Sequence, residues 1–155
     1  MHLRDLAKKH GSDKIVHGYT TLYEKLFGPI KNEPISILEI GAFHGASIRV
    51  WYDYFPNAEI QILDIDLPRI PDDLKKPPYS DRVTITYADQ SDRASLLQAT
   101  QGKTFDIIID DGSHIASHQQ TSYAALIGKV NPGGYYIVED IHVLHPAYKD
   151  KRYMD

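Results

Sequence analysis

One stretch of this chain, residues 35–47, constrains the fold more than any other. It opens with a short apolar run containing β-branched residues, Ile35–Ile40, which predicts a buried strand. Gly41 and Gly45 follow, and apolar residues then recur at helical spacing after Ser47, the expected N-cap. A strand, a glycine turn and a helix form the crossover of nucleotide-binding folds, in which glycines let a ligand approach the backbone.

The glycine spacing indicates the kind of ligand. A dinucleotide fingerprint reads G-x-G-x-x-G, whereas this turn reads E-x-G-x-x-x-G through Glu39, Gly41 and Gly45. Glu39 would repel a pyrophosphate, so the wider turn suits a cationic or zwitterionic ligand with a ribose. A side chain at Gly41 is expected to obstruct that ligand before it harms the fold. An ordinary tight turn between a core strand and a helix is the alternative for this segment alone.

Composition narrows the class of protein. The chain has 155 residues, 42% hydrophobic and 25% charged, which is ordinary for one globular domain. A formal charge of −4 argues against nucleic acid as a partner, and the lack of cysteine excludes disulfides and thiolate zinc sites. No signal peptide or membrane-spanning run is recognisable, so we expect a cytoplasmic chain without a membrane partner. We expect a helical cap over residues 1–30 and a sheet core over 31–155.

Strands alternate with helices along the rest of the chain. The expected strands after the first cover residues 59–65, 83–87, 105–109 and 135–138. The expected helices begin near residue 3, near Leu22, after an N-cap at Ser91, and after His114, and Asn131–Gly134 is expected to be a turn. This alternation predicts an α/β fold with a doubly wound, mainly parallel Rossmann-like sheet in the order 3-2-1-4-5.

Polar residues follow every expected strand. These groups are Glu39 with Gly41, Asp64, Asp89 with Gln90, Asp110 and Asp111 with His114, and Glu139 with Asp140. Ligands of doubly wound sheets bind beyond the carboxyl ends of the strands, where all these groups fall. Packing alone hardly explains five such strand ends, so we expect them to form one site.

Together these motifs resemble a known family. They read Leu38-Glu39-Ile40-Gly41-x-x-x-Gly45-x-Ser47, Asp89-Gln90-Ser91-Asp92, Phe105 through His114, and Pro132-Gly133-Gly134-x-x-x-Val138-Glu139-Asp140. The chain is similar to class I S-adenosylmethionine-dependent methyltransferases, and within them to the metal-dependent macrolide sugar O-methyltransferases. The segment Gly11 to Lys14 with His17-Gly18-Tyr19 also resembles the part that precedes their core. The likeness covers roughly residues 5–142.

The resemblance implies a role for each matched residue. The cofactor-binding set is Glu39, Gly41, Gly45, Ser47, Asp64, Asp89, Gln90 and Asp110, and Asp66 is a less favoured alternative to Asp64 as the ribose-binding acid. The Mg²⁺ ligands are Asp111, Glu139 and Asp140, and the general base is His114. His118, His142 and His145 are assigned to solvent or to the surroundings of the site.

The chemistry of these residues agrees with the implied roles. Mg²⁺ prefers oxygen ligands, so carboxylates without sulfur suffice. Metal coordination lowers the pKa of a hydroxyl acceptor, and a histidine can then take its proton. The alternative for His114 is a structural histidine at a helix start, bonded to the backbone.

The implied activity is Mg²⁺-dependent methylation of a hydroxyl on a small molecule, a sugar or glycosylated natural product. One alternative is a domain that binds the cofactor and has no acceptor site of its own. An NAD-dependent oxidoreductase is a second alternative, disfavoured by the glycine spacing.

The expected sheet is short for this fold, which usually has two further strands. Strand 135–138 would then be an apolar edge, and such edges are usually covered or paired. Pro146 and the charged run 149–152 do not suit a covering strand. We therefore expect self-association, most simply a twofold dimer.

Overall fold

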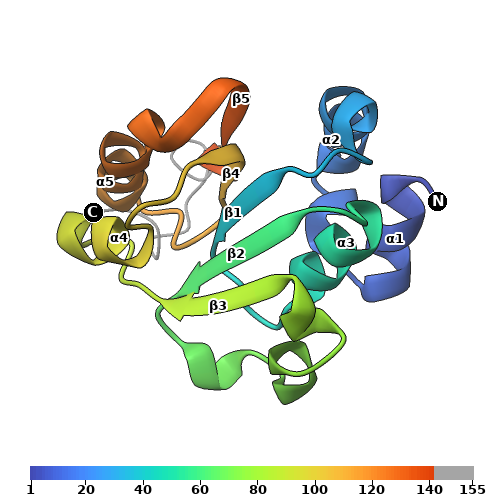
Figure 1. The fold of residues 1–155 in the computed structure, drawn as a ribbon, viewed down its shortest axis with the longest axis horizontal. Helices are drawn as coiled ribbons and strands as arrows, with labels where there is room; N and C mark the ends of the chain where they lie inside the picture. Colours follow the sequence, from blue (N-terminus) through green and yellow to red (C-terminus); the bar gives the residue numbers. More distant parts are fainter. Residues whose placement is uncertain (142–155) are drawn as a thin grey trace.

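The computed structural model describes residues 1–141 and contains one parallel sheet with helices on both faces (Figure 1). Its strands are β1 (Ser36–Ile40), β2 (Glu59–Asp64), β3 (Val83–Tyr87), β4 (Phe105–Asp110) and β5 (Val130–Val138). They lie in the order β3-β2-β1-β4-β5, with every neighbouring pair parallel. The predicted doubly wound α/β sheet and its strand order are confirmed. His142, His145, Pro146 and the run 149–152 lie outside the described residues.

The helices divide between the two faces of the sheet. Helices α1 (Leu3–His10), α2 (Tyr19–Phe27) and α3 (Ala46–Tyr54) pack on one face, and α4 (Arg93–Ala99) and α5 (Ala116–Leu126) on the other (Figure 1). Short 3₁₀ segments connect them, at Asp13–Ile15, Gly28–Ile30, Leu67–Arg69, Asp72–Lys75, Tyr79–Asp81 and Ile127–Lys129. None of the helices in residues 1–141 is long and apolar enough to cross a membrane.

Alternation along the central strands builds two hydrophobic clusters. Ile37 of β1 packs into a large cluster with Trp51 of α3 and Phe27 of α2. Its neighbour Leu38 points to the opposite face and joins a smaller cluster with Leu126 of α5. This period of two is why strands with both faces covered read as continuous apolar runs. The expected helical cap therefore shares its core with the sheet.

Both serine N-caps predicted from the sequence are wrong. Helix α3 begins two residues earlier than a cap at Ser47 implies, because its N-cap is Gly45 in a left-handed conformation. Ser47 instead donates a hydrogen bond to Glu39 Oε2 at 2.7 Å. Helix α4 has Asp92 as its N-cap, whose side chain accepts from the Ala94 N–H at 2.8 Å. In each case a residue within two positions of the predicted serine has the non-helical backbone of an N-cap, left-handed at Gly45 and extended at Asp92.

The predicted turn at Asn131–Gly134 is also wrong, because these residues belong to β5. Phe105 pairs with Val130, whereas Ile107 pairs with Tyr135, so residues 131–134 bulge out between the two pairings. The Asn131 side chain anchors the bulge by donating to Asp106 Oδ1 at 2.8 Å. A bulge leaves the strand direction intact, which local turn residues alone do not reveal.

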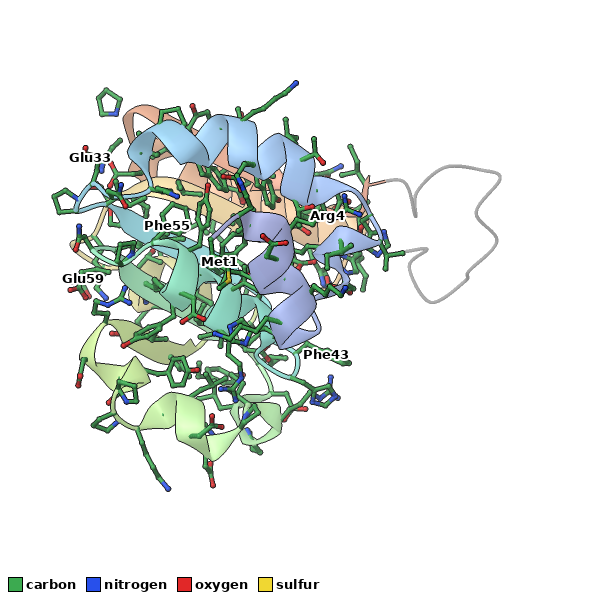
Figure 2. All side chains as sticks on the ribbon, turned by 90° about the vertical axis from the view of Figure 1, so that its right-hand side faces the viewer. Met1, Arg4, Glu33, Phe43, Phe55 and Glu59 are labelled. Atoms are coloured by element: carbon green, nitrogen blue, oxygen red, sulfur yellow. The ribbon has the colours of Figure 1, made fainter. Side chains whose placement is uncertain are left out.

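The strand ends bring the polar residues to one edge of the sheet. Backbone hydrogen bonds continue past the strands from Gly41 N–H to Leu63, from Asp111 N–H to Ile40, and from Glu139 N–H to Asp110. The loops after β1, β4 and β5 thus leave the sheet side by side. Figure 2 shows Phe43, from the first of these loops, at the opposite end of the molecule from Glu33 and Glu59.

Candidate active site

The first of two clefts at this edge is lined by four of the eight predicted cofactor residues. It has a volume of about 450 Å³. Gly41, Asp64, Asp89 and Gln90 line it, from the ends of β1, β2 and β3. Asp66 lines it too, so position in the cleft does not separate the two candidate ribose-binding acids.

Asp64 and Asp89 are held by the backbone around them. Asp64 accepts from the backbone N–H groups of Ala42 and Asp66, both at 2.7 Å, and so connects the turn after β1 to the end of β2. Asp89 accepts from the hydroxyl and the backbone N–H of Ser91, which lower the pKa of its carboxyl. Both carboxylates therefore face the cleft from fixed positions.

Asp110 lies behind the first cleft, without lining it. Its buried carboxylate accepts from the Gln90 amide at 2.6 Å and from the Ser122 hydroxyl. The other end of the Gln90 amide accepts from the Ser113 N–H at 2.8 Å, so both ends of this side chain are held. Burial raises the pKa of Asp110, partly offset by the Ser122 bond. The structure thus makes Asp110 a support for Gln90.

The second cleft, of about 470 Å³, adjoins the first. Five residues line both clefts, namely Gly41, Phe43, Asp111, Gly112 and Ser113. The remaining lining of the second cleft is mostly polar and comes from four parts of the chain. These residues are Ser12, Asp13, His17, Ala42, His44, Ala46, Ser47, His114 and Asp140.

The second cleft contains a group of side chains that could hold a metal ion. One ligand atom each of Asp111, His114 and Asp140 lies within 4.8 Å of the others. His114 Nε2 is 3.9 Å from Asp111 Oδ1 and 3.7 Å from Asp140 Oδ2. Two carboxylates fit a hard divalent cation such as Mg²⁺, and an imidazole beside them fits a proton acceptor.

Backbone strain is concentrated at the same cleft. Among the described residues, positive φ angles outside glycine occur at Phe43, His114 and Asp140, and all three line the second cleft. Such conformations cost about 1–3 kcal/mol each and tend to cluster at functional sites. Phe43 is also 65% exposed, with the Arg69 guanidinium 5.5 Å from its ring centre.

Lys14 connects three of the predicted acids beneath the clefts. Its ammonium lies 2.6 Å from Asp111, 2.7 Å from Glu139 and 3.5 Å from Glu39. Burial alone would lower the pKa of Lys14, but the carboxylates outweigh burial and raise it. Burial raises the pKa of Glu139 to about 7, with Lys14 opposing the rise. Burial also raises the pKa of Glu39, so both buried carboxyls of this group lose acidity despite the nearby ammonium.

Two of these acids, Glu39 and Glu139, line neither cleft. Glu39 is fully buried, in contact with Lys14 and Ser47, and lines neither cleft. Glu139 bonds Lys14 and the Tyr23 hydroxyl through Oε1 and is not part of the group formed by Asp111, His114 and Asp140. Gly45 also lines neither cleft.

Gly41 is required by the fold itself. Its φ is +92°, and a Cβ there would overlap the backbone of Asp111 and Gly112. The expectation that a side chain at Gly41 would obstruct the ligand before it harms the fold is wrong, because the turn after β1 packs directly on the loop after β4.

Sequence reasoning missed the contribution of the N-terminal segment. Lys14, Tyr19 and Tyr23 contact Asp111, Asp140 and Glu139, respectively. The available signal was the polar and aromatic character of residues 11–19, which exceeds what a linker needs. That signal does not say which acids these residues meet.

A family model described as a methyltransferase domain matches residues 38–141. The chain belongs to this methyltransferase-domain family. The matched residues include the loops after β1, β4 and β5 that line the clefts. Lys14, Tyr19 and Tyr23 precede the matched residues.

Two curated relatives of this methyltransferase domain are O-methyltransferases by name. The 8-demethyl-8-alpha-L-rhamnosyl tetracenomycin-C 2'-O-methyltransferase of Streptomyces olivaceus is 39% identical, over 95% of this chain and 40% of the relative. The mycinamicin VI 2''-O-methyltransferase of Micromonospora griseorubida is 36% identical, over 90% of this chain and 36% of the relative. The chain thus spans about two fifths of the length of these relatives.

A solved structure has a similar fold. MycE methyltransferase from the mycinamycin biosynthetic pathway, in complex with Mg, SAH and mycinamycin VI, superposes with a TM-score of 0.83 at 32% identity. The superposition covers 96% of this methyltransferase domain and 42% of MycE.

Proposed function

We propose that this methyltransferase domain binds S-adenosylmethionine in the first cleft and, with Mg²⁺, transfers its methyl group to a hydroxyl in the second. The acceptor class that fits best is a sugar on a glycosylated small molecule. The observation that carries the proposal is the pair of adjoining clefts. Asp111 lines both, Asp64 and Gln90 line only the first, and His114 and Asp140 line only the second. The names of the relatives and the Mg and SAH bound to MycE support it.

The first cleft supplies the groups that such a cofactor needs. Asp64 offers a carboxylate for ribose hydroxyls at the end of β2, and Asp89 and Gln90 lie farther along for the adenine side. The cofactor's cationic end would lie near Gly41, where Glu39, Asp111 and Glu139 make the surroundings negative.

The second cleft supplies the groups that activate an acceptor. Asp111 and Asp140 would hold Mg²⁺, with Glu139 as the candidate third ligand. Bound Mg²⁺ would lower the pKa of a coordinated hydroxyl. His114 Nε2, between the two aspartates, would take the hydroxyl proton as the acceptor oxygen bonds to the methyl carbon. When bound, S-adenosylmethionine would supply the methyl group and keep the electron pair of the broken carbon–sulfur bond on its sulfur. The domain would mainly align the two reactants for in-line displacement.

Calorimetry tests the proposal directly. S-adenosylhomocysteine should bind, NAD should not, and Mg²⁺ should bind to the parent but weakly to Asp111→Asn and Asp140→Asn. Glu139→Gln decides whether Glu139 is a ligand or only a partner of Lys14. Asp72→Asn, at an exposed ion pair with Lys75, is the matched control and should bind Mg²⁺ like the parent.

An activity assay distinguishes a methyltransferase from a domain that only binds the cofactor. Methyl transfer to a glycosylated acceptor, lost with chelator, would establish an enzyme. Binding of S-adenosylhomocysteine without transfer to any hydroxylated acceptor would instead favour a domain that holds the cofactor and lacks an acceptor site.

We also propose that the domain self-associates through β5. This strand pairs only with β4 in the described sheet, and its residues Tyr135–Val138 are half-buried. A twofold dimer would cover this edge. Light scattering at micromolar concentration should give twice the chain mass, and a stable monomer would contradict the proposal.

A further inference from the structure

The N-terminal segment reaches the site through three separate contacts. Lys14 binds Asp111, the Tyr23 hydroxyl donates to Glu139 at 2.6 Å, and the Tyr19 hydroxyl donates to Asp140 at 2.8 Å. The family model matches from residue 38 onward, so these three residues lie outside the matched part of the chain.

The contact of Tyr19 with Asp140 differs from the other two because it is double. The Tyr19 hydroxyl donates to Asp140 Oδ1 and also accepts from the Asp140 backbone N–H at 2.9 Å. One hydroxyl thereby fixes both the backbone and the side chain of the same residue. Asp140 has a φ of +57°, a conformation that a non-glycine residue adopts only when its surroundings impose it.

The two carboxylate oxygens of Asp140 have different neighbours. Oδ1 accepts from the Tyr19 hydroxyl and lies 4.0 Å from His17 Nδ1, while Oδ2 lies 3.7 Å from His114 Nε2. Rotation of the carboxylate or relaxation of φ would move Oδ2 away from Asp111 and His114. Tyr19 itself starts α2 and is held by stacking on Tyr23, with ring centres 6.0 Å apart.

We propose that Tyr19 is a positioning residue for the metal site, which orients Asp140 so that Oδ2 joins Asp111 in holding Mg²⁺. The proposal rests on the function proposed above. Hydrogen-bond partners behind metal ligands typically change metal affinity 10- to 100-fold when removed.

Tyr19→Phe removes the hydroxyl and keeps the ring that stacks on Tyr23. Calorimetry on the 155-residue chain should give a dissociation constant for Mg²⁺ roughly 10- to 100-fold weaker than that of the parent. The dissociation constant for S-adenosylhomocysteine should stay within twofold. Tyr52→Phe is the matched control, because its hydroxyl bonds Pro78 away from both clefts, and it should leave both constants unchanged.

A second readout distinguishes positioning from a general loss of structure. In Tyr19→Phe, raising the Mg²⁺ concentration should restore methyl transfer, whereas a structural defect would not respond to the ion. Unchanged Mg²⁺ affinity in a folded Tyr19→Phe variant overturns the inference while the proposed function stands. Absence of Mg²⁺ binding to the parent would instead refute the metal in the proposed function, and the role of Tyr19 with it.

Discussion

The ammonium of Lys14 lies 2.6 Å from Asp111 Oδ2, although the two residues are 97 positions apart in the chain. Its side chain is 3% exposed, and it is also bonded to Glu139. A single buried cation thus joins the N-terminal segment to the ends of β4 and β5. Removing one member of such a buried group leaves the others uncompensated.

Lys14→Met should therefore cost about 3–5 kcal/mol in the free energy of unfolding at pH 8. The cost should be smaller at pH 5. Burial raises the pKa of Glu139 to about 7, so its carboxyl gains protonated, uncharged character as the pH falls through that value and then needs no cation. Urea unfolding measures both. Lys9→Met is the control, because the Lys9 side chain is 55% exposed beside Asp53, and it should cost less than about 1 kcal/mol at either pH. Equal losses of stability in the two variants would contradict a buried role for Lys14.

Three glycines with positive φ should differ in their tolerance of alanine. Gly102 has open space around its Cβ position, so Gly102→Ala should cost only the roughly 1–2 kcal/mol of the left-handed conformation. Gly41→Ala should cost about 1–3 kcal/mol more, because the Cβ meets the backbone of Asp111. Gly45→Ala should fall between them, since its Cβ meets the end of the Leu74 side chain. Thermal unfolding ranks the three, and a Gly41→Ala variant as stable as Gly102→Ala would refute the close approach.

Asp106 should make stability depend on pH in the acid range. Burial alone would raise the pKa of its carboxyl, but hydrogen bonds from Ser36 and Asn131 outweigh burial and lower it. A carboxyl whose pKa is lower in the folded than in the unfolded state stabilises the folded protein at pH values above the unfolded pKa of about 3.9. This stabilisation is lost as the pH falls through the folded pKa. Asp106→Asn should thus cost roughly 1 kcal/mol at pH 7 and little near pH 2. A cost independent of pH would mean that the charge of Asp106 is not what these donors stabilise.

His114 and His118 should separate chemistry from cofactor binding. His114 lines only the second cleft and His118 only the first. His114→Ala should slow methyl transfer by roughly 100-fold or more and leave S-adenosylhomocysteine affinity unchanged. His118→Ala should weaken that affinity and affect turnover less. Single-turnover rates and calorimetry on the two variants test this, and the reverse pattern would assign the base to His118.

The sequence alone determined the architecture of the sheet. Apolar runs such as Ile107–Ile109 can be buried only between two helical layers, and each run ends where polar residues begin. Parallel strands bring such ends to one edge, so the order of the strands is enough to predict that Asp64, Gln90 and Asp111 converge. The sequence did not determine the caps: Ser91 and Asp92 both have suitable side chains, and the backbone conformation in the fold selects Asp92.

Only the tertiary structure decided which acids line the clefts and which are buried beneath them. Glu39, Asp110 and Glu139 look like Asp64 and Asp111 in sequence, since each is an acid at a strand end. Alternation between the two faces of β1 turns Glu39 under the N-terminal segment, and burial places Asp110 behind Gln90. Lys14 and Tyr19 contact Asp111 and Asp140, which are 97 and 121 positions away in the sequence. No local pattern encodes such contacts, because they depend on how the first helices pack against the sheet.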